Sequence, residues 1–208
     1  MISVKDVCQQ VPVIPVLVVK DVAHARPLAE ALVKGGLHVL EVTLRTAAAL
    51  EAIRIMADVP GSLVGAGTVL TPADVKAVKA AGAHFAVSPG ATDALLTAAE
   101  DAGLALLPGA STASEVMYLL ERGFSTQKFF PAEAAGGIPM LKSLYGPLSA
   151  VSFCPTGGIN VQSAAQYLAL PNVLCVGGSW LTPDALVQAG DWQAVHDLAR
   201  ATQVLRAA

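Results

Sequence analysis

Short apolar runs rich in β-branched residues alternate with longer amphipathic stretches along the whole chain. A short run of this kind is typical of a buried strand, whereas apolar residues at helical spacing are typical of a helix that covers a sheet. The alternation predicts eight strands, at residues 13–18, 38–44, 63–67, 85–88, 104–108, 126–130, 151–155 and 173–177. Helices are expected between them, including 23–34, 47–57, 72–81 and 92–102, with a last helix over 191–206.

Signals for the ends of helices support the same division. A threonine before a proline is an expected helix start, and such pairs occur at residues 71–72 and 182–183. Thr112 and Glu115 have the spacing of a capping box. Four glycines follow helical patterns and are expected to end them in the left-handed conformation, namely Gly35, Gly82, Gly103 and Gly123.

Repeated strand–helix units joined by short loops predict an α/β fold in which a parallel sheet closes into a (β/α)8 TIM barrel with its helices outside. An open, doubly wound sheet is the structural alternative. The 208 residues suit one large core. Because no linker or low-complexity segment interrupts them, residues 1–208 are expected to form a single barrel domain.

Composition narrows the class of protein. Hydrophobic residues make up 54% of the chain, yet no uninterrupted apolar run reaches the roughly 18 residues of a membrane span. The partly polar N-terminus does not resemble a signal peptide. A cytoplasmic protein without a membrane partner is therefore expected.

Charge and cysteine content exclude further classes. The net charge is −3 at pH 7 and the basic residues are dispersed, which argues against a nucleic-acid partner. Cys8, Cys154 and Cys175 are an odd set without close spacing, so small core residues are expected rather than disulfides or a metal site. A phosphorylated substrate stays compatible with the charge, because a helix N-terminus can hold a phosphate locally.

Lys128 is the first candidate for chemistry, because it stands alone in the apolar run from Gln127 to Pro131. Burial favours the neutral amine, which is nucleophilic and can attack a ketone to form a Schiff base. The alternative is a lysine at a strand end whose ammonium reaches solvent.

Polar residues near the C-terminal ends of the predicted strands are the next candidates, since active sites of parallel barrels lie at that end. Glu41, Thr43 and Arg45 share one parity in the second strand and therefore one face. If that face points inward, these residues form a site. The reverse parity would bury the charges against apolar helices, which costs more.

Glycine-rich turns follow three predicted strands, at residues 65–68, 156–158 and 177–179. The first ends in Thr68, and its glycines let a ligand approach the backbone. The other two follow the seventh and eighth strands, a common phosphate site in barrels. Asn160 is placed to cap the helix after the second turn.

Seven segments carry a family resemblance: PVIPV at 12–16, LEVTLRT at 40–46, VGAGTVL at 64–70, SPG at 88–90, KFFPAE at 128–133, FCPTGGI at 153–159 and GGSW at 177–180. Together they resemble the 2-keto-3-deoxy-6-phosphogluconate (KDPG) aldolase family, which also includes 4-hydroxy-2-oxoglutarate (KHG) aldolases. Their order covers nearly the whole chain. Gln127 departs from the pattern, which has a larger or aromatic side chain there.

The resemblance implies roles for individual residues. Lys128 is expected to form the Schiff base, and Glu41 to act as the general acid and base. Arg45 suits the substrate carboxylate, because a planar guanidinium offers paired donors, and Thr68 is expected nearby. The other expected substrate-binding residues are Pro89, Phe130 and Thr156, with Gly157, Gly158 and Ser179 at the phosphate.

The expected activity is that of a class I aldolase, a carbon–carbon lyase that cleaves KDPG to pyruvate and glyceraldehyde 3-phosphate without a metal or cofactor. A KHG aldolase and an aldolase for the 6-phosphogalactonate epimer are alternatives with the same mechanism. Alternatives of another class are a non-catalytic phosphate-binding barrel and an isomerase that never forms an imine. The resemblance also implies a homotrimer and a place in sugar-acid breakdown by the Entner–Doudoroff pathway.

Overall fold

Strands and helices alternate in the computed structural model, which describes residues 2–206. The strands are β1 (Val13–Leu17), β2 (Val39–Thr43), β3 (Leu63–Gly67), β4 (Phe85–Val87), β5 (Ala105–Leu107), β6 (Gly109–Ala110), β7 (Thr126–Phe129), β8 (Ser152–Pro155) and β9 (Val176–Gly178). The α-helices are α1 (Val4–Gln9), α2 (Ala25–Lys34), α3 (Ala49–Ala57), α4 (Pro72–Ala80), α5 (Asp93–Ala102), α6 (Ala113–Glu121), α7 (Gly137–Tyr145), α8 (Val161–Leu168), α9 (Asp184–Ala189) and α10 (Trp192–Ala201). Two 3-10 helices, η1 (Val22–His24) and η2 (Thr202–Arg206), accompany them.

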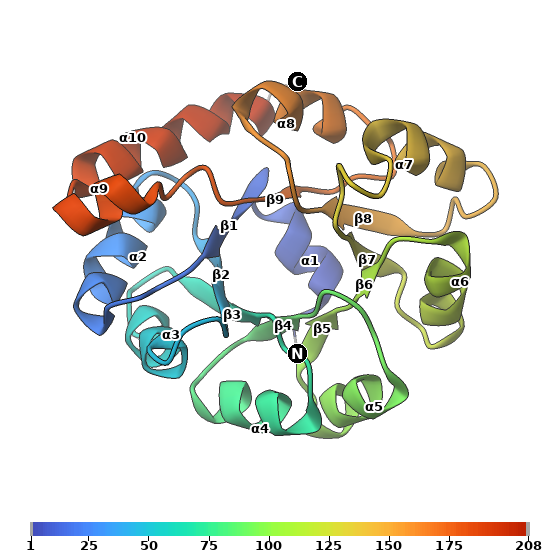
Figure 1. The fold of residues 1–208 in the computed structure, drawn as a ribbon, viewed down its shortest axis with the longest axis horizontal. Coiled ribbons are helices and arrows are strands. Elements are labelled where there is room, and N and C mark those ends of the chain that lie inside the picture. The colour runs from blue at the N-terminus through green and yellow to red at the C-terminus, as the bar shows by residue number, and fades with distance from the viewer. Residues whose placement is uncertain (1, 207–208) are drawn as a thin grey trace.

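The strands form two parallel sheets. Six strands follow the order β5-β4-β3-β2-β1-β9, and three follow the order β6-β7-β8. The sheets adjoin at both edges: only Pro108 separates β5 from β6, and single parallel bridges join Phe153 to Val173 and Thr156 to Gly177. Figure 1 shows the strands around a common centre, with α2 to α10 outside them.

The strands are buried on both faces, as in parallel sheets covered by helices. All residues of β1 and β2 are buried, so their apolar runs are nearly continuous. Inside the ring, the Phe85 side chain occupies the space beside Gly65, where an added Cβ would lie 2.4 Å from the ring. Glycine in β3 therefore makes room for a large core side chain in β4. Among the described helices, none combines the length and the apolar character that crossing a bilayer requires.

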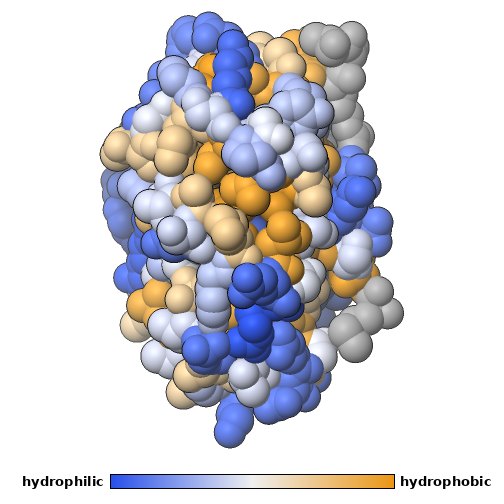
Figure 2. Space-filling model, turned by 90° about the vertical axis from the view of Figure 1, so that its right-hand side faces the viewer, coloured by the Kyte–Doolittle hydropathy of each residue, from blue (hydrophilic) through white to orange (hydrophobic). Residues whose placement is uncertain are grey.

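One face of the molecule carries exposed apolar residues. In Figure 2 they gather in the middle of the side that bears α6 and α7, and hydrophilic residues border them. Met117 of α6 is 52% exposed and Tyr145, the last residue of α7, is 39% exposed. Patches of this kind often mark contact surfaces between proteins.

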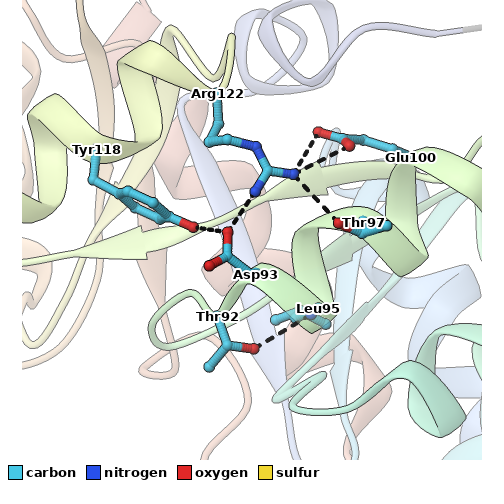
Figure 3. A network of polar contacts seen from close by, with 7 residues as sticks. All are labelled: Thr92, Asp93, Leu95, Thr97, Glu100, Tyr118 and Arg122. Carbon is cyan, nitrogen blue, oxygen red and sulfur yellow. Dashed lines mark hydrogen bonds and ion pairs between the residues drawn. The ribbon is translucent and has the colours of Figure 1, made fainter.

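Arg122 links the neighbouring helices α5 and α6 from its position just after α6 (Figure 3). Its guanidinium lies 2.6 Å from a carboxylate oxygen of Asp93 and 3.2 Å from one of Glu100. The Tyr118 hydroxyl donates to the same Asp93 carboxylate, and this hydrogen bond raises the pKa of Tyr118. Because Asp93 and Glu100 are largely exposed, we expect these contacts to orient the helices more than to stabilise them.

The predicted strand positions are confirmed in outline and wrong at two places. The strand expected over 104–108 ends at Leu107 and resumes at Gly109, because Pro108 has no N–H to donate to a ladder. The strand expected over 173–177 runs from Val176 to Gly178, and Val173 makes only an isolated bridge. The apolar pattern does not predict the helix α1, although Ser3 and Asp6 form its capping box.

Local sequence signals predict most of the helix starts correctly. The helix start at Thr71 and Pro72, the capping box at Thr112 and the Asn160 cap are all confirmed. Thr71 also forms a capping box, with Asp74. The start predicted at residues 182–183 is wrong: Pro183 takes the N-cap position in an extended conformation (ψ 133°), and no side chain caps α9.

Three of the four predicted left-handed glycines are confirmed. Gly82, Gly103 and Gly123 have φ values of 92°, 60° and 88°. Gly35 is right-handed, with φ −74°, and the following Gly36 takes the positive φ of 95° instead. The helix α2 still ends at Lys34, and the left-handed residue follows it one position later than predicted.

Candidate active site

Lys128 lies on β7 with its side chain turned into the ring of strands, only 5% exposed. Its Nζ is 3.3 Å from Oε1 of Glu41 on β2 and 5.2 Å from the centre of the Phe130 ring. Its backbone N–H donates to the Pro108 carbonyl at 2.8 Å, which fixes the strand beside β6. The lysine is therefore held in place, and its amine faces a carboxylate and an aromatic ring.

Glu41 occupies the facing position and is 3% exposed. An added Cβ on Gly67 of β3 would lie 2.2 Å from its Oε1, so only glycine leaves room for this carboxylate. Among the ion pairs of residues 2–206, Lys128–Glu41 is the one with both side chains buried. Taking two charges out of water is costly, which indicates a function other than stability.

The remaining polar residues of the second predicted strand follow the same face. Thr43 is fully buried and donates its hydroxyl to the Leu17 carbonyl at 2.9 Å, which joins β2 to β1. Arg45 lies beyond the strand end and is exposed, and its Nε donates to Thr68 Oγ1 at 3.4 Å. Thr68 has φ 60°, a conformation that is strained for a residue with a side chain and that clusters at functional sites.

The two glycine turns after β8 and β9 lie side by side. Thr156 pairs with Gly177, and an added Cβ on Gly177 would lie 2.2 Å from Thr156 Oγ1. That hydroxyl is buried and has no hydrogen-bond partner in the described residues. Gly157 and Gly158 have φ values of 105° and 81°, which strongly favour glycine. Ser179 is exposed at the second turn.

Phe130 contacts the lysine directly, and Pro89 is connected to it through Gly109. Phe130 lies under the Lys128 amine, and one of its ring carbons would be 3.5 Å from a Cβ added to Gly157. Pro89 packs against Gly109, whose added Cβ would be 2.3 Å from the Pro89 carbonyl, and Gly109 pairs in register with Lys128.

The structure thus brings the predicted residues together in groups. Lys128, Glu41 and Phe130 form one group, Arg45 and Thr68 a second, and the turn at 156–158 adjoins the turn at 177–179. Among the described residues, no hydrogen bond joins Arg45 to the lysine–glutamate pair.

The fold gathers the three cysteines in space, although their sequence spacing gives no hint of it. All three are buried and free, which confirms them as small core residues. Cys8, on α1, interacts with Cys154 and Cys175. Hydrogen bonding to Cys154, together with burial, raises the pKa of the Cys8 and Cys175 thiols well above the usual value.

Sequence reasoning assigned no role to Glu133 and Tyr167, which adjoin the candidate site. Glu133 follows the Phe130–Pro131 turn, and its Oε1 accepts a hydrogen bond from the fully buried Tyr167 of α8 at 2.6 Å. The signal available was the position of Glu133 at the end of the KFFPAE segment, since its partner lies 34 residues away.

The sequence of this chain is similar to those of known aldolases. Residues 4–198 match the family model described as KDPG and KHG aldolase. The chain is 53% identical to the 2-dehydro-3-deoxy-phosphogluconate aldolase of Pseudoalteromonas atlantica, over 96% of this chain and 93% of that protein. It is 52% identical to the KHG/KDPG aldolase of Escherichia coli K12, over 95% and 93%.

Two solved structures of aldolases share this fold. The KDPG aldolase of Legionella pneumophila, with pyruvate captured as a covalent carbinolamine intermediate, superposes with a TM-score of 0.93 at 50% identity, over 95% of this chain and 97% of that one. The KDPG aldolase of Zymomonas mobilis ZM4 with 3-phosphoglycerate gives a TM-score of 0.89 at 52% identity, over 93% and 91%. The chain therefore belongs to the KDPG and KHG aldolase family.

Proposed function

We propose that this chain is a class I aldolase that cleaves KDPG to pyruvate and glyceraldehyde 3-phosphate. The observation that carries the proposal is the buried pair of Lys128 and Glu41, with an amine and a carboxylate 3.3 Å apart inside the ring of strands. An amine in this setting can lose its proton to the carboxylate and become a nucleophile. The Legionella relative, which holds pyruvate as a covalent carbinolamine, supports the same chemistry.

In the proposed mechanism, the Lys128 amine attacks C2 of the keto acid, and loss of water gives a protonated imine. The imine withdraws electrons, so the C3–C4 bond breaks as the C4 hydroxyl loses its proton to Glu41, directly or through water. Glyceraldehyde 3-phosphate leaves, and the electron pair stays on C3 as an enamine. Protonation of C3 and hydrolysis of the imine then release pyruvate and restore the amine.

Both ends of the substrate have candidate partners. Arg45, positioned by Thr68, suits the carboxylate, because its guanidinium is exposed at the strand ends and offers paired donors. The backbone N–H groups of Gly157 and Gly158 and the hydroxyl of Ser179 suit the phosphate, since the two turns adjoin each other. Thr156 suits a substrate hydroxyl, and we assign the lining of the reacting carbons to Phe130 and Pro89.

We further propose that the two sheets form one closed (β/α)8 barrel and that residues 1–208 form one domain. The bridge between Thr156 and Gly177 and the continuity of β5 with β6 across Pro108 support closure. We also propose that three copies of the chain form a homotrimer, because the exposed apolar face around Met117 and Tyr145 offers a contact surface. Sedimentation equilibrium tests the trimer, which Met117→Glu should weaken.

We place the enzyme in the cytoplasm, in sugar-acid breakdown by the Entner–Doudoroff pathway.

A KHG aldolase activity is the second candidate. The relative from E. coli is named a KHG/KDPG aldolase at 52% identity, and both substrates present the same pyruvoyl end to Lys128. The two activities therefore differ only at the part of the substrate that faces the glycine turns. A relative named for the galactonate epimer is only 27% identical, so that substrate is less supported.

The decisive experiment measures pyruvate release from KDPG and from KHG at matched low concentrations, with a coupled dehydrogenase. We expect a strong preference for KDPG. In parallel, borohydride with pyruvate should trap a covalent adduct on the wild-type enzyme and none on Lys128→Met. Release of pyruvate by Lys128→Met would exclude the imine mechanism, and no release from either substrate would favour a binding barrel or an isomerase.

The role of Glu41 has its own test. Glu41→Gln keeps the size and the hydrogen bond to Lys128 but cannot carry the proton, so turnover should fall by about 10²-fold. Steady-state kinetics on KDPG measures this, with Glu51→Gln on the exposed face of α3 as the matched control. Unchanged turnover in Glu41→Gln would move the proton-transfer role to another group.

A further inference from the structure

Lys128 lies on β7, and the turn that follows β7 is hydrogen-bonded to the glycine turn after β8. The Ala132 N–H donates to the Thr156 carbonyl at 2.8 Å, and the Glu133 N–H donates to the Gly157 carbonyl at 3.1 Å. These bonds occupy the carbonyl side of the glycine turn. Its N–H groups are the part that our proposed function assigns to the substrate phosphate.

The Glu133 side chain fills the space beneath the same turn. A Cβ added to Gly158 would lie 2.5 Å from Glu133 Cγ and 2.7 Å from its Cβ, so the glycine and the glutamate stem are in direct contact. Gly158 also has φ 81°, which an L side chain rarely adopts. The orientation of this peptide therefore depends on where the Glu133 stem lies.

Tyr167 fixes that stem from the other side. Its hydroxyl donates to Glu133 Oε1 at 2.6 Å, and its ring is fully buried on α8, the helix that starts just after the glycine turn. A Cβ on Gly137, the first residue of α7, would lie 3.0 Å from the Tyr167 hydroxyl. The pair thus connects the β7 turn, the β8 turn, α7 and α8. Burial and the Glu133 carboxylate raise the pKa of Tyr167 well above its usual value, so it stays a donor.

The charge of Glu133 does not explain its presence, because a carboxylate beside a phosphate site repels the ligand. We infer that Glu133 and Tyr167 are positioning residues that orient the Gly157–Gly158 turn and thereby set the preference for a phosphorylated substrate. This inference rests on the proposed function and adds a determinant of substrate choice. It makes the hydrogen-bond acceptor of Glu133 essential and its charge dispensable.

The experiment compares Glu133→Ala, Glu133→Gln and Tyr167→Phe with Glu121→Ala, an exposed glutamate at the end of α6. KM and kcat are measured on KDPG and on KHG. Loss of one hydrogen bond to a charged group should raise KM for KDPG about tenfold in Glu133→Ala and Tyr167→Phe. KM for KHG and kcat for both substrates should stay within about twofold of wild type, and Glu133→Gln should match wild type or bind KDPG more tightly.

Three outcomes would overturn the inference: equal losses on both substrates, no change in Glu133→Ala, or Glu133→Gln behaving like Glu133→Ala. Thermal unfolding identifies a variant that merely fails to fold, and Tyr167→Phe provides the conservative second test. Calorimetry with inorganic phosphate gives a readout that does not require catalysis. If the wild-type enzyme releases no pyruvate, the proposed function fails, whereas weaker phosphate binding by Glu133→Ala than by Glu133→Gln would still support the positioning role.

Discussion

At the scale of single residues, the ion pair of Lys128 and Glu41 is unusual because both of its charges lie in the apolar core. Each charge loses its hydration, and the desolvation penalty is several kcal/mol per ion even in real proteins. The mutual attraction across 3.3 Å offsets this only in part. Because apolar residues of similar size would fill the same space without that cost, the pair is better explained by chemistry than by folding.

This argument makes a prediction about stability. Lys128→Met leaves Glu41 buried without its cation and should lower the free energy of unfolding by about 3 kcal/mol. Adding Glu41→Leu removes the unpaired charge, so the double variant should recover to wild-type stability or above while staying inactive. Urea denaturation measures both. Arg54→Met in the exposed Glu51–Arg54 pair is the control and should change stability by less than about 1 kcal/mol. A double variant less stable than Lys128→Met would show that the pair supports the fold.

Arg45 leads to a prediction about affinity. Its guanidinium is exposed and, within residues 2–206, is held by one long hydrogen bond to Thr68, which leaves the outer pair of donors for a carboxylate. Arg45→Ala should weaken pyruvate binding by about 10- to 100-fold, the usual value of hydrogen bonds between charged groups. Arg45→Lys keeps the charge but not the planar geometry and should fall in between. Calorimetry on both variants checks this, and undiminished binding by Arg45→Ala would refute the carboxylate assignment.

Much of the site follows from the sequence, because its signals are local. The parity of β2 places Glu41 on the inner face with Thr43, and the glycine pairs mark the two turns. The Glu133–Tyr167 contact could not be predicted, since it depends on how α8 packs against a turn far away in the sequence. Gln127 has a similar explanation: its side-chain amide donates to the Val116 and Phe124 carbonyls outside the ring. A polar residue is therefore accommodated in place of the expected large one, because it bonds to α6 and to the segment that follows α6.

At the scale of elements, predictions held where a side chain acts on its own backbone. Thr71 and Thr112 cap helices because hydroxyl and carboxylate groups within one turn satisfy the free N–H groups there. The start at residues 182–183 failed because Pro183 is extended instead of helical. The break between β5 and β6 falls at Pro108, a residue whose effect on a strand is local. The positive φ at Gly36 instead of Gly35 depends on packing against α10, where a Cβ on Gly35 would lie 2.6 Å from Ala199, and local patterns do not contain this contact.

The cap of α6 predicts a pH dependence. Hydrogen bonds, first from the Ser111 N–H and also from Thr112, hold the pKa of Glu115 below its ordinary value of 4.5. The charged carboxylate therefore contributes stability above the unfolded pKa, and this contribution is lost as the pH falls through the lower folded pKa. Wild type should exceed Glu115→Gln by about 0.5 kcal/mol at pH 7, because an anion is favourable at a helix N-terminus.

The difference between wild type and Glu115→Gln should vanish in acid, below the lowered pKa of Glu115. Urea denaturation at a series of pH values measures it. Glu121→Gln is the matched control at the opposite end of α6, where wild type should show no such advantage over the glutamine variant at pH 7. A difference that persists at pH 2 would mean that the carboxylate acts by packing and not by charge.

At the scale of the whole molecule, the six-stranded and the three-stranded sheet are expected to unfold as one cooperative unit. The bridges at Thr156–Gly177 and Phe153–Val173 join the sheets at one edge, and Pro108 continues one sheet into the other at the second edge. The site draws on both sheets, since Glu41 belongs to the larger and Lys128 to the smaller. A ligand bound covalently to Lys128 and held by Arg45 should therefore stabilise both sheets together.

Pyruvate provides the test of this coupling. At a concentration 100 times its Kd, it should add about 2.7 kcal/mol to the free energy of unfolding, which for a chain of this size is a rise in Tm of roughly 5–10 °C. Far-ultraviolet circular dichroism reports on all elements, and fluorescence reports on Trp180 and Trp192 in the C-terminal part. Both signals should show one transition at the same Tm, shifted equally by pyruvate, because one cooperative domain has no separately melting half. Lys128→Met should show no comparable shift. If pyruvate raised the transition of one signal and left the other in place, the two sheets would be separate folding units, and the single closed barrel would have to be abandoned.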